Sequence, residues 1–273
     1  MTQFMYITWD VSPVIFKIGG FELRWYGLLF AAGFVLGYQI LARIFKLEKQ
    51  KEEALDSLLL TMIISTVLGA RIGHYVFYEG YRFADAPIQF IIDMLVPPYA
   101  GLASHGASIG ILIGLYIYTK KQKATYLWVT DRVVIAAALG GASIRLGNLM
   151  NSEIVGKATD VSWAFLFKQN TEFEQVPRHA AQLYEALSCL VLFGILLALY
   201  NKWREKAPAG ALTGLFFTWI FTLRFCYEFL KENQENFENT MALNMGQILS
   251  IPLVIFGLYL LYRSLLSKKP LTI

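Results

Sequence analysis

The fold class follows from residues 26–45, which read YGLLFAAGFVLGYQILARIF. Arg43 is the one charged residue in this stretch. Twenty helical residues are about 30 Å long, which matches the hydrocarbon core of a membrane. A chain in lipid must satisfy its backbone hydrogen bonds internally, and the run lacks the alternation of a barrel strand. The stretch therefore predicts a transmembrane helix.

Six further apolar stretches have a similar length. The seven predicted spans cover residues 26–45, 57–78, 103–119, 133–150, 182–200, 210–230 and 246–266. Composition agrees, because 56% of the 273 residues are hydrophobic and 16% are charged, against about 25% charged in a soluble domain. We expect an all-α polytopic membrane protein that forms one integral membrane domain over residues 1–273.

Lysine and arginine gather after the first, third, fifth and seventh predicted spans. The loops between these carry few basic residues or balance them with acidic ones. By the positive-inside rule the N-terminus lies outside and the C-terminus lies in the cytoplasm. Residues 1–24 lack the features of a cleavable signal peptide and are predicted to lie on the outer surface. Residues 151–181 form a small outer loop region.

Several function classes find no support. The net charge of +4 is too mild to indicate nucleic-acid binding. Cys189 and Cys226 lie inside apolar runs and read as buried hydrophobic residues. No metal-ligand spacing and no disulfide framework is present. We expect no metal site.

Glycines recur at four-residue spacing, as in Gly69 and Gly73 or Gly106 and Gly110. Such spacing lets helix backbones approach closely in lipid. The pattern fits either dimerisation or packing within one bundle. Packing is preferred because several predicted spans carry the pattern.

Polar and ionisable residues of the spans concentrate near the predicted outer ends. An ionisable residue in a span costs at least about 2.5–3.5 kcal/mol, so each calls for a reason. A channel or transporter would need polar groups through the whole depth, whereas this asymmetry predicts a polar pocket in the outer leaflet. The residues are Arg24, Tyr26, Arg71, His74, His105, Arg145, Asn148, Asn151, Glu153, Gln182, Tyr184, Glu185, Arg224, Glu228 and Gln247.

Arg71, Arg145 and Arg224 lie at similar predicted depth on three helices. A forked guanidinium suits phosphate, and lipid head groups supply phosphate at this depth. The alternative is a structural ion-pair network in which Glu153, Glu185 and Glu228 offset these charges.

The chain has three histidines. His105 is the group near the predicted pocket that exchanges a proton near neutral pH. His74 is given a packing role, and His179 is expected in the outer interface.

Residues 145–156, RLGNLMNSEIVG, closely resemble the signature G-R-x-G-N-F-x-N-x-E-x-x-G of bacterial prolipoprotein diacylglyceryl transferases. Ile144 replaces its first glycine and Leu149 its phenylalanine. Other pieces agree in order from about residue 12 to residue 252. They are Arg24-Trp25-Tyr26-Gly27, Gly69-Ala70-Arg71, Ser104-His105-Gly106, Arg178-His179 with Gln182-Leu183-Tyr184-Glu185, Arg224 with Glu228, and Met245-Gly246-Gln247.

Some positions depart from the family pattern. Ala180 and Ala181 stand where the family has Pro-Ser, and Ile220 stands where a tyrosine is frequent. Lys231 occupies a position at which arginine is common. These departures concern one wall of the site and not the reaction.

The resemblance implies an activity. Such enzymes move the diacylglyceryl group of phosphatidylglycerol to the lipobox cysteine of a prolipoprotein, forming a thioether and releasing glycerol-1-phosphate, in the first step of lipoprotein maturation. It implies no cofactor, a multi-pass location in the bacterial cytoplasmic (inner) membrane, and an active site toward the outer leaflet. The resemblance implies catalytic roles for His105, Arg145 and Arg224. Binding of phosphatidylglycerol falls on Tyr26, Arg71, Arg145, Asn148, Glu153, Gly156, Glu185 and Glu228.

The chemistry fits these residues. A free thiol is only about one part in thirty thiolate at neutral pH, and His105 could act as the base that raises this fraction. Arg145 and Arg224 could neutralise the departing phosphate. An intramembrane serine protease is a weaker alternative, because no G-x-S-G elbow is present. A purely structural membrane subunit is disfavoured by the long signature.

Overall fold

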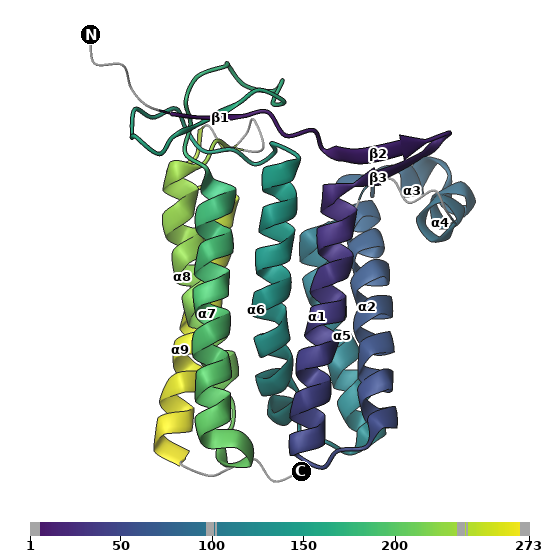
Figure 1. Cartoon of the computed structure of the whole chain (residues 1–273). Coiled ribbons are helices and arrows are strands. Elements are labelled where there is room, and N and C mark those ends of the chain that lie inside the picture. The colour runs from purple at the N-terminus through teal and green to yellow at the C-terminus, as the bar shows by residue number, and fades with distance from the viewer. Residues whose placement is uncertain (1–5, 97–100, 102, 234–237, 239, 268–273) are drawn as a thin grey trace. The chain divides into compact units, whose positions relative to one another are not determined.

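The computed structural model describes residues 6–96, 101, 103–233, 238 and 240–267. It is mostly helical (Figure 1), and each predicted apolar stretch corresponds to a long helix. Residues 1–5 of the predicted outer segment lie outside the described part. The helices are α1 (Trp25–Leu47), α2 (Glu52–Tyr78), α5 (Ser104–Gln122), α6 (Tyr126–Met150), α7 (Ala181–Trp203), α8 (Ala211–Tyr227) and α9 (Met245–Ser267).

Among the described residues, five helices are long and apolar enough to cross a membrane: α1, α2, α6, α7 and α9. The chain is therefore an apolar, mainly helical protein of the membrane type. The helices α5 and α8, with 19 and 17 residues, fall outside this set.

Short elements that the sequence did not predict join these helices. Between α2 and α5 the chain forms α3 (Arg82–Asp85) and α4 (Pro87–Leu95). The 3-10 turns η1 (Arg204–Lys206) and η2 (Glu228–Leu230) follow α7 and α8. The fold is mainly helical, in agreement with the all-α expectation, and the described residues also form four short strands. They are β1 (Ile7–Trp9), β2 (Val14–Ile18), β3 (Phe21–Arg24) and β4 (Phe165–Phe167).

The strands β2 and β3 form an antiparallel hairpin directly before α1. Gly19, with φ +59°, and Gly20 make its turn, and glycine is the residue that adopts this backbone conformation without strain. Lys17 pairs with Glu22 across the ladder, and their side chains form an ion pair of 2.7 Å.

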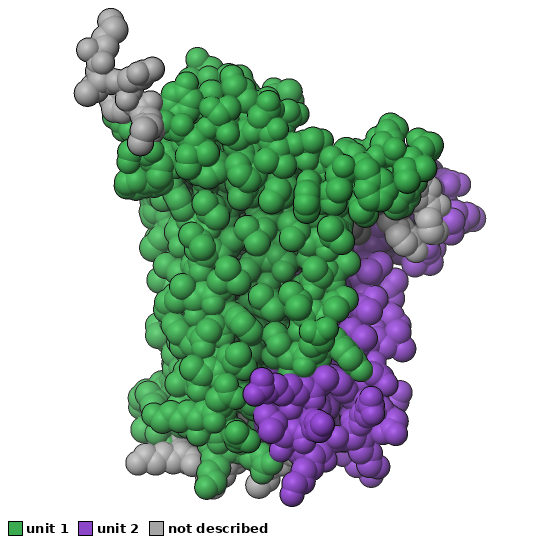
Figure 2. All heavy atoms as spheres, in the orientation of Figure 1, with its two compact units in different colours: residues 1–41, 131–271 green, residues 42–130, 272–273 purple. Residues whose placement is uncertain are grey.

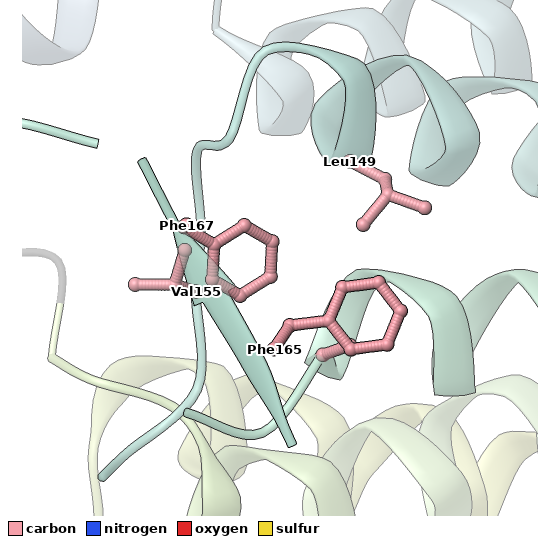
Figure 3. Packing of buried hydrophobic residues seen from close by; sticks show 5 residues of the cluster. Leu149, Val155, Phe165 and Phe167 are labelled. Atoms are coloured by element: carbon pink, nitrogen blue, oxygen red, sulfur yellow. The ribbon is translucent and has the colours of Figure 1, made fainter. Parts of the chain in front are cut away.

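The strand β1 pairs in parallel with β4, so the start of the chain contacts the loop after α6. Figure 3 shows the small apolar core to which β4 contributes, in which Leu149 and Val155 pack with Phe165 and Phe167. Trp9 packs against the same core and donates its Nε1 hydrogen to the Leu149 carbonyl at 3.0 Å. The core therefore anchors the loop to the end of α6.

The chain divides into two compact units, shown in Figure 2: residues 1–41 with 131–271, and residues 42–130 with 272–273. In the first unit, α6 contributes Asp131, whose side chain is fully buried. Its carboxylate accepts hydrogen bonds from the backbone N–H groups of Gly210 and Thr213, both at 2.8 Å. Asp131 thus satisfies backbone donors at the start of α8 that the helix itself leaves unpaired.

In the second unit, α2 and α5 pack backbone to backbone at the glycines. A Cβ atom on Gly106 would lie 2.3 Å from the Gly69 carbonyl oxygen and 2.6 Å from the Gly73 Cα. A Cβ atom on Gly110 would lie 2.4 Å from the Ser65 carbonyl oxygen. Packing within one chain is therefore confirmed as the use of these glycines.

Gly110→Ala should destabilise the protein, because the new methyl group would meet backbone that cannot rotate away. Overpacking of this kind costs about 1–3 kcal/mol, so the melting temperature in detergent should fall by several degrees. Gly194→Ala on α7 is the matched control, since nothing lies within 4 Å of that position. An equal effect of both substitutions would contradict the close approach of α2 and α5.

Candidate active site

The signature residues lie at the end of α6 and in the turn that follows it. Arg145 donates an Nη1 hydrogen to Asn148 Oδ1 at 3.2 Å. Asn148 in turn donates its Nδ2 hydrogen to Glu153 Oε1 at 2.6 Å, and Asn151 donates to the same oxygen at 3.3 Å. The helix thus sets Arg145 and Asn148 one turn apart, and the turn brings the Glu153 carboxylate back toward them.

This turn adopts backbone conformations that side chains other than glycine rarely take. Ser152 and Ile154 have φ values of +53° and +58°. Such residues cost about 1–3 kcal/mol each and persist when surrounding contacts hold them. Here Gln182 of α7 donates to the Glu153 carbonyl at 2.6 Å, and Asn170 donates to the Ser152 carbonyl at 2.9 Å. Glu153 was predicted in this region from the sequence. The strained turn explains how its carboxylate points back toward the end of α6.

Gly156 ends the signature and lies between two other backbone segments. Its N–H group donates to the His179 carbonyl at 2.9 Å, and it forms an antiparallel bridge with Lys231. A Cβ atom at this position would lie 2.6 Å from the His179 carbonyl oxygen and 2.8 Å from the Leu230 carbonyl oxygen. These contacts explain why the position holds glycine, and they support a packing role.

Two arginines of this unit each face a buried carboxylate. Arg145 Nε lies 2.6 Å from Glu185 Oε2 on α7, and Arg224 Nε on α8 lies 3.9 Å from Glu228 Oε1. The Arg145 contact is an ion pair whose angles are not those of a hydrogen bond. Lys231 Nζ lies between the two carboxylates, 3.4 Å from Glu185 Oε1 and 2.9 Å from Glu228 Oε1.

Exposure separates the two signs of charge in this cluster. The side chains of Glu185 and Glu228 are only 9% and 7% exposed, whereas those of Arg145 and Arg224 are 24% and 33% exposed. The carboxylates therefore lie behind the guanidinium groups, and the accessible part of the cluster is cationic. Such a surface suits an anionic ligand, since guanidinium donors match phosphate oxygens.

Tyr26, near the start of α1, belongs to the same unit. Its ring packs on the backbone of α6 at Gly147. A Cβ atom added to Gly147 would lie only 2.8 Å from Tyr26 Cδ2. Gly147 comes two residues after Arg145 in the signature. The structure thus brings Tyr26, Arg145, Asn148 and Glu153 to one end of α6.

Arg71 is placed in the second unit and has a different environment from the other two arginines. It is buried, and its guanidinium donates to the carbonyls of Met94 at 3.2 Å and Gly101 at 3.3 Å. It also donates to the Tyr75 hydroxyl at 3.2 Å. These contacts tie α4 and the chain before α5 to α2. They are the contacts of a structural clamp, and binding of lipid by Arg71 stays a prediction.

His105 and His74 also lie in the second unit. His105 follows the first residue of α5, its side chain is exposed, and the next residue is Gly106, whose backbone contacts α2. The His74 ring packs on Gly101 and bonds Glu79 at 2.9 Å, in agreement with a packing role. Hydrogen bonds from Arg82 and then His74 lower the pKa of Glu79, so its carboxylate is charged at neutral pH.

His179 lies in the loop before α7, and its interfacial position stays a prediction. The ring is half-buried, and its Nδ1 lies 3.2 Å from the Tyr184 hydroxyl. Burial lowers the pKa of His179, so the neutral ring is favoured. Its backbone carbonyl holds Gly156, which makes His179 part of the frame around the signature.

A sequence model of the family described as "Prolipoprotein diacylglyceryl transferase" matches residues 13–263. The chain belongs to this family. Similar proteins carry the name "Phosphatidylglycerol–prolipoprotein diacylglyceryl transferase", among them three from different organisms. The one from Bacteroides fragilis is 42% identical over 94% of each chain. That from Chloroherpeton thalassium is 42% identical over 95% of this chain and 94% of its own. That from Tolumonas auensis is 41% identical over 95% and 98%.

Two parts of this charged cluster were not predicted from the sequence. Lys231 was treated only as a departure from arginine, although its spacing of three residues from Glu228 is a helical ion-pair spacing. Asn244 donates to Glu228 Oε2 at 3.0 Å, and a Cβ atom on Gly246 would lie 2.7 Å from Glu228 Cδ. The family piece Met245-Gly246-Gln247 therefore makes room for the Glu228 carboxylate.

Gly156→Ala should reduce both stability and activity. The added methyl group would push apart two backbone segments, at a cost of about 1–3 kcal/mol, and would displace the chain that carries Lys231. Thermal unfolding and the rate of diacylglyceryl transfer would be measured together. Gly20→Ala in the hairpin turn is the control, because nothing lies within 4 Å of Gly20. Normal unfolding and transfer in Gly156→Ala would show that the enclosure is looser than described.

Proposed function

We propose that the chain transfers the diacylglyceryl group of phosphatidylglycerol to the cysteine thiol of a prolipoprotein lipobox. The sulfur forms a bond to the glyceryl carbon, the bond from this carbon to the phosphate oxygen breaks, and glycerol-1-phosphate leaves. Family membership and the names of the relatives support this reaction. The observation that carries it in the structure is the pair of partly exposed arginines backed by buried carboxylates.

The arginines supply what the leaving group needs. Negative charge develops on the phosphate ester as its bond to carbon breaks, and preorganised cations near that oxygen lower the barrier. Arg145 and Arg224 have the required charge and partial exposure, while Glu185 and Glu228 hold their orientation. Binding of phosphatidylglycerol is further assigned to Tyr26, Arg71, Asn148, Glu153 and Gly156, with Asn148 and Glu153 orienting Arg145.

The thiol proton also needs an acceptor. We assign this role to His105, whose side chain is exposed at the start of α5. A base that takes the proton raises the fraction of thiolate, and the thiolate is the nucleophile. The reaction as written uses only the two substrates and this base.

Backbone pairing supports seven crossings of the membrane. Strands that pair lie on one side of the membrane, so an even number of crossings separates β1 from β4. Three of the helices between them, α1, α2 and α6, have the length and apolar character of a span. We therefore count α5 as the fourth.

The same reasoning applies to α7 and α8. Gly156 bonds to His179 before α7 and pairs with Lys231 after α8. An even number of crossings must separate those two partners, so α8 crosses if α7 does. With α9 the total is seven, in one integral membrane domain.

The basic loops orient this bundle with the N-terminus outside and the C-terminus in the cytoplasm. The end of α6 that carries Arg145, and the turn after it that carries Glu153, then face the outer leaflet of the bacterial cytoplasmic membrane. Phosphatidylglycerol and the membrane-anchored signal peptide of the prolipoprotein would both reach the site from within the bilayer.

Arg145→Ala should lower the transfer rate by about a hundredfold or more, which is the usual effect of removing a preorganised charge at a reacting oxygen. Purified protein would receive phosphatidylglycerol and a lipobox peptide, and mass spectrometry would follow the diacylglyceryl thioether and glycerol-1-phosphate. Arg43 is an exposed arginine near the C-terminal end of α1, and Arg43→Ala should leave the transfer rate unchanged. Wild-type turnover by a folded Arg145→Ala protein would refute the phosphate role.

His105→Ala should slow transfer by about a hundredfold or more, because a general base usually raises the rate by at least about that factor. The same assay applies, with Ile109→Ala as a control for exposed positions of α5. The base assignment fails if His105→Ala keeps near-normal turnover.

A further inference from the structure

We propose that Lys231 is a positioning residue that sets how far Arg145 and Arg224 extend toward the phosphate. The inference rests on the phosphate role proposed for these two arginines. Lys231 itself is 2% exposed and is not placed to contact a ligand.

The first support is the position of its charge. Lys231 Nζ lies 2.9 Å from Glu228 Oε1 and 3.4 Å from Glu185 Oε1. A buried ammonium group is tolerated only when it is paired, and here two carboxylates from different elements share it. Lys231 is thus the cation common to both.

The second support is what each carboxylate does next. Glu185 uses its other oxygen, Oε2, for Arg145 at 2.6 Å, and Glu228 faces Arg224 at 3.9 Å. The series Arg145–Glu185–Lys231–Glu228–Arg224 is therefore continuous, with Lys231 at its centre. The positions of the two partly exposed arginines are linked through one buried side chain.

The third support is the backbone of Lys231, which is fixed on both sides. Lys157 N–H donates to the Leu230 carbonyl at 2.7 Å, and Glu232 N–H donates to the Val155 carbonyl at 3.3 Å. Lys231 itself pairs with Gly156 in the antiparallel bridge between these bonds. The ammonium group is therefore tethered to the segment that ends the signature.

Loss of the Lys231 charge would leave Glu185 and Glu228 as two buried carboxylates without their shared cation. The remaining cations near them are Arg145 and Arg224, so each carboxylate would draw its arginine inward to compensate. Both guanidinium groups would then be less available to a phosphate. A displacement of about 1 Å at such a site can cost a hundredfold in rate.

The test measures steady-state kinetics of Lys231→Met, Lys231→Gln and Lys231→Arg with phosphatidylglycerol in detergent micelles and a lipobox peptide. The neutral variants should lower kcat/KM for phosphatidylglycerol by about tenfold to a hundredfold, while KM for the peptide stays unchanged. Lys231→Arg keeps the charge and should recover to within about threefold of wild type. Lys157→Met removes an exposed lysine of the adjoining segment and should behave as wild type.

The outcomes separate this inference from the proposed function. A wild-type protein that forms no thioether product would overturn both. An active wild type together with folded neutral variants of normal kinetics would overturn the role of Lys231 alone. A purely structural role would lower the melting temperature without the phosphatidylglycerol-specific change in kcat/KM. If neither neutral variant folds in detergent, Lys231 is a structural residue and the inference is wrong.

Discussion

Glu185 and Glu228 are carboxylates buried in an apolar helical chain, and an unpaired carboxylate in such surroundings costs several kcal/mol. Each must therefore be held by cations, and the chain supplies Arg145, Arg224 and Lys231 from three separate elements. The need to satisfy these two negative charges fixes the ends of α6, α7 and α8 relative to one another. The arginines meet that need with part of their guanidinium surface still exposed, which leaves it available for a phosphate.

The helices themselves are held by a different constraint. Lipid chains are as apolar as leucine, so burial of apolar surface does little to join helices in a membrane. Close backbone approach at glycine takes its place, as between Gly106 and Gly69 or between Gly214 and Gly257. Buried polar contacts add direction, and Asp131 is the clearest case because it bonds the backbone at the start of another helix. Close packing at small residues and a few directed polar hydrogen bonds together hold the helices.

The sequence predicted the seven helices closely, because an apolar run of about twenty residues is a local signal that needs no partner. It also singled out the polar residues that the structure places near the end of α6, since they stand out against that apolar background. The β1–β4 pair was missed because three-residue strands depend on a partner more than 150 positions away. Lys231 was not predicted to join the charged cluster for the same reason. Its partner Glu185 lies on a different helix and is distant in the sequence. Arg71 was grouped with the other arginines on depth alone, whereas its guanidinium donates to backbone carbonyls and to the Tyr75 hydroxyl of its own unit.

The parallel pairing of β1 with β4 has a consequence for biosynthesis. β1 precedes α1, α2, α5 and α6 in the chain and β4 follows them, so β4 is made only after these four helices. Until then β1 lacks its β4 partner. The pairing is possible only if residues 7–9 and 165–167 have reached the same face of the bilayer. The strand pair can therefore form only in a chain whose segment from α1 to α6 crosses the membrane an even number of times.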